Sequence, residues 1–123
     1  MSKFYNEIAE KYDYIFPLSP AHQTFFASEL CGKTVLDVGA ATGNLTAHLL
    51  SQGYKVTAID LNERLIAEAA KKGIVVQPLN MLDIDQLAIF NNIVCIGNTL
   101  PHLDSKTSVQ LFLQKAYGQL AQK

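Results

Sequence analysis

The amino-acid sequence predicts a doubly wound α/β fold with a mostly parallel sheet, and three observations support that prediction. Short apolar runs alternate with helical patterns along most of the chain. Glycines close several of the helical patterns, and a turn of small residues follows the first apolar run. Strands that alternate with helices form βαβ units, and right-handed crossovers place the helices on both faces of the sheet. We expect the strand order 3-2-1-4, with residues 34–38 central and further helices preceding the sheet.

Apolar runs and residues that favour helix ends define the individual elements. The predicted strands are Thr34–Val38, Lys55–Ile59, Ile74–Val76 and Asn92–Ile96. The predicted helices are an N-terminal segment with Tyr5, Ile8, Ala9 and Tyr12, a helix opened by Ser19 and Pro20 that carries Phe25, Phe26 and Leu30, residues 44–52, a helix capped by Asn62 and closed by Gly73, and a last helix from Ser105. The core face of the last helix is expected to contain Val109, Phe112, Leu113, Ala116 and Leu120.

Composition is that of a single globular domain. The chain has 123 residues, of which 49% are hydrophobic and 17% are charged, and its formal net charge is −1. Disordered chains are poorer in apolar residues and carry more net charge. The lysines and arginines are scattered along the sequence, so nothing favours a nucleic acid as partner.

Neither the N-terminal residues, nor the apolar runs, nor the cysteines suggest an exported or membrane-bound protein. The first residues lack the charged-then-apolar pattern of a signal peptide, and no apolar run is long enough to span a bilayer. Cys31 and Cys95 have no metal-ligand spacing, and we expect both thiols to be reduced and buried. These features predict a cytoplasmic protein that makes no membrane contact.

The most informative stretch is the turn after the first predicted strand, Gly39-Ala-Ala-Thr-Gly43. In a doubly wound sheet, ligands bind beyond the carboxyl ends of the strands, where this turn lies. Gly39 can adopt backbone angles that other residues avoid, and the following helix offers N–H groups to a ligand anion. The glycine spacing fits neither the dinucleotide pattern G-x-G-x-x-G nor a P-loop, and a purely structural turn stays an alternative.

A carboxylate at the end of the second predicted strand favours a ligand that contains ribose. Asp60 closes an apolar strand and stands 21 residues after Gly39. In nucleotide-binding βαβ units an acidic residue at this place accepts hydrogen bonds from ribose hydroxyls. Leu61, next to it, can lie flat against a purine. The alternative, a helix cap at Asp60, competes with Asn62, which already fills that role.

These motifs resemble those of the class I S-adenosylmethionine-dependent methyltransferases. The resemblance rests on residues 35–43 (Val-Leu-Asp-Val-Gly-Ala-Ala-Thr-Gly) and 58–61 (Ala-Ile-Asp-Leu), and it covers the whole chain. The Tyr-x₆-Tyr-Asp segment at 5–13 is similar to the family's lid helix, and residues 96–103 resemble a segment of its small-molecule N-methyltransferase branch. The resemblance implies one Rossmann-like domain over residues 1–123, S-adenosylmethionine as cofactor, S-adenosylhomocysteine as product and a small-molecule methyl acceptor.

The same resemblance implies a set of cofactor-binding residues. Asp37 and the turn would hold the methionine portion, Asp60 would bind the ribose, and Asn80 with the backbone of Met81 would contact the adenine. The full set is Tyr5, Asp37, Gly39, Ala40, Ala41, Gly43, Asp60, Leu61, Asn80, Met81, Gly97 and Asn98. The last two would line the passage to the transferable methyl group.

Two positions depart from the family's pattern. Ala41 replaces a usual glycine, and we expect the additional methyl group to cost little. Asn80 replaces a usual aspartate, which weakens the adenine contact but keeps an acceptor. Asp83 is a nearby carboxylate that can substitute for it, or a cap for the turn 83–87.

Methyl transfer from a sulfonium is an in-line displacement that needs a water-poor, pre-aligned site and no nucleophilic residue. A Ser-His-Asp or metal-ligand pattern is therefore not required, and we expect no metal. Tyr5 and Tyr12 can stabilise positive charge with an aromatic face, and helix packing is the alternative. His102 can be a weak base or substrate contact, and a solvated loop histidine is the alternative. Tyr12 and His102 are the candidate catalytic residues.

The resemblance also implies a sheet that continues beyond the fourth strand, whereas only one helix follows that strand here. We therefore expect a domain that is truncated before its fifth strand, with residues 92–96 at an uncharged edge where another copy of the chain can pair. Two other functions stay open: a cofactor-binding module or fragment without turnover, and a dinucleotide-binding domain, which the glycine spacing disfavours.

Overall fold

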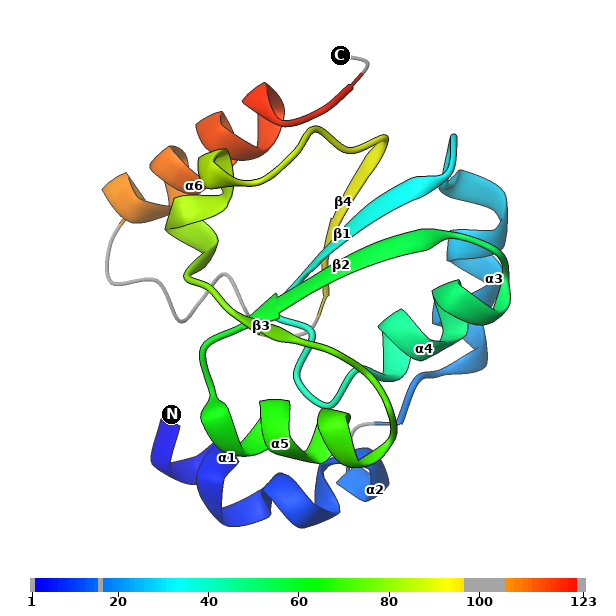
Figure 1. Ribbon diagram of the computed structural model, residues 1–123, viewed down its shortest axis with the longest axis vertical. Coiled ribbons are helices and arrows are strands. Elements are labelled where there is room, and N and C mark those ends of the chain that lie inside the picture. Colours follow the sequence, from blue (N-terminus) through cyan, green and yellow to red (C-terminus); the bar gives the residue numbers. More distant parts are fainter. Residues whose placement is uncertain (1, 16, 97–105, 122–123) are drawn as a thin grey trace.

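A computed structural model describes residues 2–15, 17–96 and 106–121 and confirms the predicted topology. Four parallel strands form one sheet in the order β3-β2-β1-β4, with β1 central (Figure 1). Helices cover both faces of this sheet, as right-handed crossovers between parallel strands require. None of the helices in these ranges is long and apolar enough to cross a membrane.

The elements follow the predicted order, with differences at their ends. The strands are β1 (Thr34–Val38), β2 (Lys55–Asp60), β3 (Gln77–Pro78) and β4 (Asn92–Cys95). The helices are α1 (Ser2–Ile8), η1 (Ala9–Lys11), α2 (Tyr12–Ile15), α3 (Pro20–Glu29), α4 (Asn44–Ser51), α5 (Glu63–Lys71), η2 (Met81–Gln86) and α6 (Lys106–Gly118).

The third strand lies later than the sequence predicted. Residues 74–76 are not a strand, because they complete the end of α5: Gly73 is left-handed, and the Ile74 N–H donates to the Ala69 carbonyl at 3.0 Å. This is the Schellman arrangement that commonly ends a helix. Pairing with β2 starts only at Gln77, and it stops at Pro78, whose nitrogen has no hydrogen to donate.

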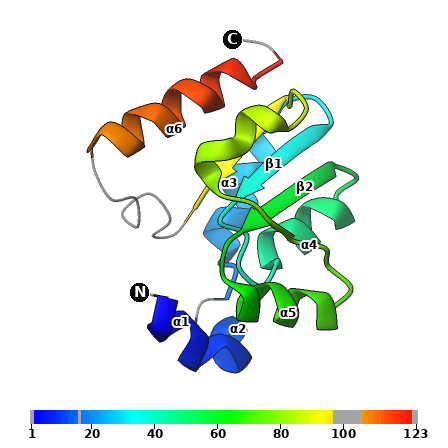
Figure 2. The same cartoon turned by 60° about the vertical axis from the view of Figure 1, so that its left-hand side comes forward.

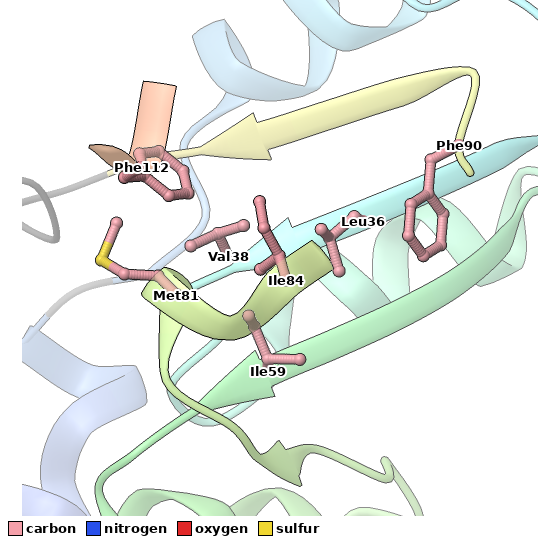
Figure 3. Packing of buried hydrophobic residues seen from close by; sticks show 7 residues of the cluster. All are labelled: Leu36, Val38, Ile59, Met81, Ile84, Phe90 and Phe112. Atoms are coloured by element: carbon pink, nitrogen blue, oxygen red, sulfur yellow. The ribbon is translucent and has the colours of Figure 1, made fainter. Parts of the chain in front are cut away.

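One face of the sheet packs against η2 and α6 (Figure 3). Alternate residues of a strand point to the same face, so β1 contributes Leu36 and Val38 to this layer. The buried cluster consists of Leu36, Val38, Ile59, Met81, Ile84, Phe90 and Phe112. The predicted core face of α6 is correct at Phe112 and wrong at Leu113, which is 53% exposed.

The opposite face packs against α3, α4 and α5. Its core consists of two clusters, one with Phe26, Val35, Leu45, Leu49 and Val94, and one with Ala40, Ala58, Ala69 and Val76. Phe26 is the aromatic anchor of α3, whereas the neighbouring Phe25 is 56% exposed because the helix turns it away from the sheet. Cys31 is also exposed, so the prediction of two buried thiols is wrong for Cys31.

The C-terminal residues return to the start of β4. α6 ends at Gly118, so Leu120 is not on its core face as predicted; it forms a parallel bridge with Phe90 instead. The Phe90 N–H donates to the Gln119 carbonyl at 2.8 Å, and the Ala121 N–H donates to the Phe90 carbonyl at 2.7 Å. The chain after α6 therefore runs alongside the segment that leads into β4.

Two asparagine side chains join β1 and β4 at the end of the sheet where both strands begin. Asn92 is buried, accepts from the Cys31 N–H at 3.0 Å and donates to the carbonyls of Cys31 and Thr34. The side-chain oxygen of Asn91 accepts from the N–H groups of Lys33 at 3.0 Å and Thr34 at 3.1 Å. These side chains satisfy backbone groups that the loop before β1 leaves without a ladder partner.

The substitution Asn92→Ala should lower the free energy of unfolding by about 2–4 kcal/mol, because it leaves several partly buried backbone groups without partners. Urea unfolding followed by circular dichroism measures the change. Gln110→Ala on the exposed side of α6 is the control, and it should change stability by less than about 0.5 kcal/mol. Equal effects of the two substitutions would contradict this role of Asn92.

Candidate functional site

The predicted turn lies between β1 and α4, at the edge of the sheet where β1 and β2 end. The N–H groups of Gly39 and Ala40 both donate to the Ile59 carbonyl at 2.9 Å. The Gly43 N–H donates back to the Ala40 carbonyl at 2.9 Å and closes the turn. The turn is therefore fixed to the end of β2, which brings the two predicted ligand-binding segments together.

Asp60 is the last residue of β2 and is half-buried beside this turn. One of its carboxylate oxygens accepts from the Ala41 N–H at 2.9 Å, and the other accepts from the Asn62 N–H at 2.9 Å. A carboxylate has about four acceptor positions, so Asp60 keeps acceptor capacity for a ligand. Leu61 follows with 58% exposure and offers an apolar surface beside it. Asn62 caps α5 by accepting from the Leu65 N–H, as predicted.

Three residues of the turn have positive φ: Gly39, with φ of 73°, and the two neighbours of Thr42. Gly43 has φ of 82°, and a Cβ at this position would lie 2.6 Å from the Cγ2 of Ile74, so only glycine fits. Ala41 has φ of 53°, which costs an ordinary residue roughly 1–2 kcal/mol. The expectation that Ala41 costs little is therefore wrong for the backbone. Its methyl group is buried against Ala9 and Leu65, which offsets part of the strain.

Asp37 lies within β1 and points toward α4. It is 1% exposed, and one carboxylate oxygen accepts from the Thr46 hydroxyl at 2.7 Å. The pKa of this carboxyl is raised from 3.8 to about 6, mainly because burial disfavours the charged form; the hydrogen bond from Thr46 lowers the pKa and the charge of Asp60 raises it, and both effects are included in that value. Asp37 thus lies beneath the turn, not on its open side.

A third carboxylate belongs to Asp13 of α2, a residue for which the sequence analysis predicted no role. Its oxygens accept from the Thr42 hydroxyl, from the Asn44 side chain at 2.9 Å and from the Lys72 ammonium at 2.7 Å. Burial alone would raise the pKa of Asp13, but these hydrogen bonds and the charge of Lys72 lower it below 3.8. The only sequence signal was its place after Tyr12, because all its partners lie far along the chain.

The predicted adenine contacts lie in the turn after β3. The Asn80 side chain accepts from the Leu82 N–H at 2.8 Å and caps η2, and Asp83 lies at a kink inside η2 with non-helical backbone angles (φ −112°, ψ 17°), so its role as a cap of the turn 83–87 stays a prediction. The Met81 side chain is buried in the core, which leaves only its main chain for a ligand. Asn80 therefore caps η2 with its side-chain oxygen, and the expected adenine contact would be made by the same side chain.

The remaining predicted residues are placed in part. Tyr12 is half-buried and packs against the cluster of Ala9, Ala41 and Leu65 beside the turn. Tyr5 falls within α1. Gly97, Asn98 and His102 lie outside the described residues. Among the side chains that are described, no cluster of three or more histidine, cysteine or acidic residues could hold a metal ion.

A comparison with protein families decides the identity of this arrangement. Residues 35–122, which include the turn, Asp60 and all elements after them, match the family described as "Methyltransferase domain". The chain belongs to this methyltransferase family. The match covers most of the chain and confirms the resemblance on which the site residues were chosen.

Individual relatives agree with this assignment. A candidate methyltransferase of Geobacillus sp. (strain WCH70) is 28% identical over 127 residues, which cover 92% of this chain and 51% of the relative. The glycine/sarcosine/dimethylglycine N-methyltransferase of Actinopolyspora halophila is 24% identical over 98% of this chain and 24% of its own length.

Solved structures show the same fold. An S-adenosylmethionine-dependent methyltransferase from Clostridium acetobutylicum superposes with a TM-score of 0.74 at 21% identity, over 95% of this chain and 53% of its own. The CcbJ methyltransferase of Streptomyces caelestis gives a TM-score of 0.80 at 21% identity, over 94% of this chain and 52% of its own. This methyltransferase chain thus spans about half the length of these structures and of the Geobacillus relative.

The substitution Asp37→Asn should stabilise the chain at pH 7 by up to about 3 kcal/mol, because the folded state raises the pKa of the carboxyl from 3.8 to about 6. A raised acid pKa means that the folded state binds the proton more tightly than the unfolded state. The stability that this proton gives to the wild type is fully present below about pH 4, and it is lost as the pH rises to about 6. The substituted asparagine can still accept from the Thr46 hydroxyl. The stability difference between variant and wild type, measured by urea unfolding, should grow from pH 4 to pH 6 and then stay constant. A difference that does not change with pH would contradict the raised pKa.

Proposed function

We propose that the edge of the sheet formed by the turn after β1, the end of β2 and the turn after β3 binds S-adenosylmethionine, for methyl transfer to a small-molecule acceptor. Membership of the methyltransferase family supports the reaction class. Several of the solved structures with this fold contain S-adenosylmethionine, including a glycopeptide N-methyltransferase and an amino pentose methyltransferase. The residues of this chain determine whether such a ligand fits.

The charge around the turn carries the proposal. Three carboxylates, those of Asp13, Asp37 and Asp60, lie on or next to it, and only Asp13 has a cationic partner, Lys72, among the described residues. S-adenosylmethionine brings a sulfonium and an ammonium group against one carboxylate, and its net positive charge is attracted by these carboxylates. The pyrophosphate of a dinucleotide would add negative charge to a site that already has an excess of it. The charges therefore favour the sulfonium cofactor over the dinucleotide alternative.

Each part of the cofactor has residues in this chain that fit it. Residues 39–43 would hold the methionine portion, with the Asp37 carboxylate acting on it from beneath the turn, and Asp60 would accept from the ribose hydroxyls with its remaining lone pairs. Leu61 would lie against the adenine, whose edge would meet Asn80 and the main chain of Met81. Tyr5, Gly97 and Asn98 complete the proposed contacts.

When bound, S-adenosylmethionine supplies an electrophilic methyl group, so the protein itself needs only to align the acceptor and exclude water. Tyr12 packs beside the turn and can lower the energy of positive charge with its ring. His102 would take a proton from the acceptor or contact it. A chain that binds the cofactor without turnover is the second candidate, because this chain spans only about half the length of relatives with the family's fold.

A small molecule is the acceptor class that the relatives support. The Actinopolyspora relative, which aligns with nearly the whole of this chain, is named for glycine, sarcosine and dimethylglycine. The structurally similar proteins include an enzyme for magnesium protoporphyrin IX. Incubation with methyl-labelled cofactor and candidate amines, followed by mass spectrometry of the products, tests for turnover.

The substitution Asp60→Ala should weaken binding of S-adenosylhomocysteine by roughly 30- to 150-fold, which corresponds to the loss of about 2–3 kcal/mol in hydrogen bonds to a charged group. Isothermal titration calorimetry measures the dissociation constant, and NAD, titrated separately, should give no heat of binding. Asp85→Ala, at an exposed carboxylate near the end of η2, is the matched control. An unchanged dissociation constant in folded Asp60→Ala, or binding of NAD by the wild type, would contradict the proposed site.

We also propose that the chain self-associates through β4. This strand lies at the end of the sheet order, and no described strand lies outside it. Ile93 and Val94 give the edge no charge that would discourage pairing. The bridge between Leu120 and Phe90 covers only the segment before β4. An additional strand, from a second copy, would extend the sheet from there.

Light scattering of the 123-residue chain at increasing concentration should therefore give a mass above the 13.5 kDa of one copy. An edge strand without charged side chains favours such pairing. The same preparation should transfer methyl groups weakly or not at all. A stable monomer with full turnover would contradict this prediction.

A further inference from the structure

A single polar cluster connects the N-terminal segment to the turn after β1. The Asp13 carboxylate accepts from the Thr42 hydroxyl, the Asn44 side chain and the Lys72 ammonium. Lys72 also donates to the side-chain oxygen of Asn44 at 2.8 Å, which closes the ring of contacts. The four residues come from α2, the turn, the first position of α4 and the residue after α5. We call this set of four residues the Asp13 cluster.

Apolar contacts place the same segment along α5. Ala9 and Tyr12 pack against Ala41 and Leu65, and the Arg64 guanidinium donates to the Asn6 carbonyl at 3.3 Å. Figure 2 shows α1 and α2 beside α5, and α1 and η1 contact α5. The Asp13 cluster lies next to this apolar contact and is the part that reaches the turn itself.

We propose that the Asp13 cluster is a latch, and that Asp13 is a positioning residue that sets the conformation of the turn for the cofactor. This inference rests on the proposed function, since it concerns the same site. Asp13 acts through Thr42 and Lys72, and it does not itself contact the reacting atoms.

The conformation of the turn explains why the single hydrogen bond between Thr42 and Asp13 affects its shape. Thr42 is 1% exposed and lies between Ala41, with φ of 53°, and Gly43, with φ of 82°. Ala41 has an unfavourable backbone conformation that persists only when surrounding contacts hold it. The Thr42 hydroxyl, bound to Asp13, is one of those contacts, and the Asp60 carboxylate on the Ala41 N–H is another. When the latch opens, the turn loses the contact at Thr42 and keeps those to Ile59 and Asp60.

The latch is weak enough to open. The side chains of Lys72 and Asp13 are 34% and 45% exposed, and half-exposed ion pairs stabilise proteins only slightly. Asp13 lies on α2, which has 4 residues, and the preceding α1 has 7 residues, so both helices are too short to be stable alone. Only molecules with a closed latch present the turn in the conformation that the ligand needs. The apparent affinity is therefore the affinity of the closed form multiplied by the fraction of molecules that are closed.

The test uses Asp13→Ala, Lys72→Ala, the double variant, Lys72→Arg and the control Asp85→Ala, which removes a comparably exposed ion pair with Lys115. Calorimetry gives the affinity for S-adenosylhomocysteine, and hydrogen exchange without ligand reports on residues 9–15 and 41–43. Asp13→Ala should lower the affinity about tenfold and speed exchange in both ranges. Lys72→Ala should have a smaller effect, and the double variant should match Asp13→Ala. Lys72→Arg and the control should bind like the wild type.

The outcomes separate the latch from the proposed function. Wild type that binds no S-adenosylhomocysteine would overturn both. Wild type that binds, together with Asp13→Ala that binds equally well or exchanges no faster at 41–43, would overturn only the latch. If Asp13→Ala does not fold, Asp13→Asn, which keeps the side-chain shape and removes the charge, provides the same comparison.

Discussion

The attachment of the turn after β1 to the end of β2 is the constraint on which the rest of the site depends. Two N–H groups of the turn share the Ile59 carbonyl, and the next residue, Asp60, accepts from Ala41 on one side and from Asn62 on the other. One short stretch of β2 thus determines the shape of the turn and the start of α5. A ligand at this edge meets groups whose positions the backbone has already determined, which lowers the entropy lost on binding.

Local patterns were sufficient to predict much of this arrangement. The strand order, the turn and the cap at Asn62 follow from alternation, glycine positions and capping residues, all of which act over a few positions. The start of β3 was missed because a helix-ending motif and an apolar run have similar sequences at residues 74–76. The exposed side chain of Leu113 was misplaced because helical spacing alone does not fix which way a helix faces.

The polar contacts of the site could not be predicted because they join distant segments. Asp13 binds residues 29 and 59 positions away, Thr42 and Lys72, and no periodic pattern encodes such a pairing. The strain at Ala41 is likewise invisible in sequence, since it arises from the path of the turn between β1 and α4. Both features concern the same few residues, where local preference and global structure disagree, as is common at functional sites.

The asparagine contacts lie at the opposite end of β1 from the turn, so the residues that stabilise the sheet are separate from those of the candidate site. Asn91 and Asn92 hold the strands together where they begin, whereas the turn and its carboxylates lie where the strands end, five residues along β1. At about 3.3 Å per residue, this is a separation of roughly 16 Å. Substitutions in the loops at the end of the sheet that carries the turn can therefore be combined with stabilising substitutions at the other end, because sites so far apart affect stability almost independently. The stability of the fold and the shape of the candidate site can thus be changed by separate substitutions.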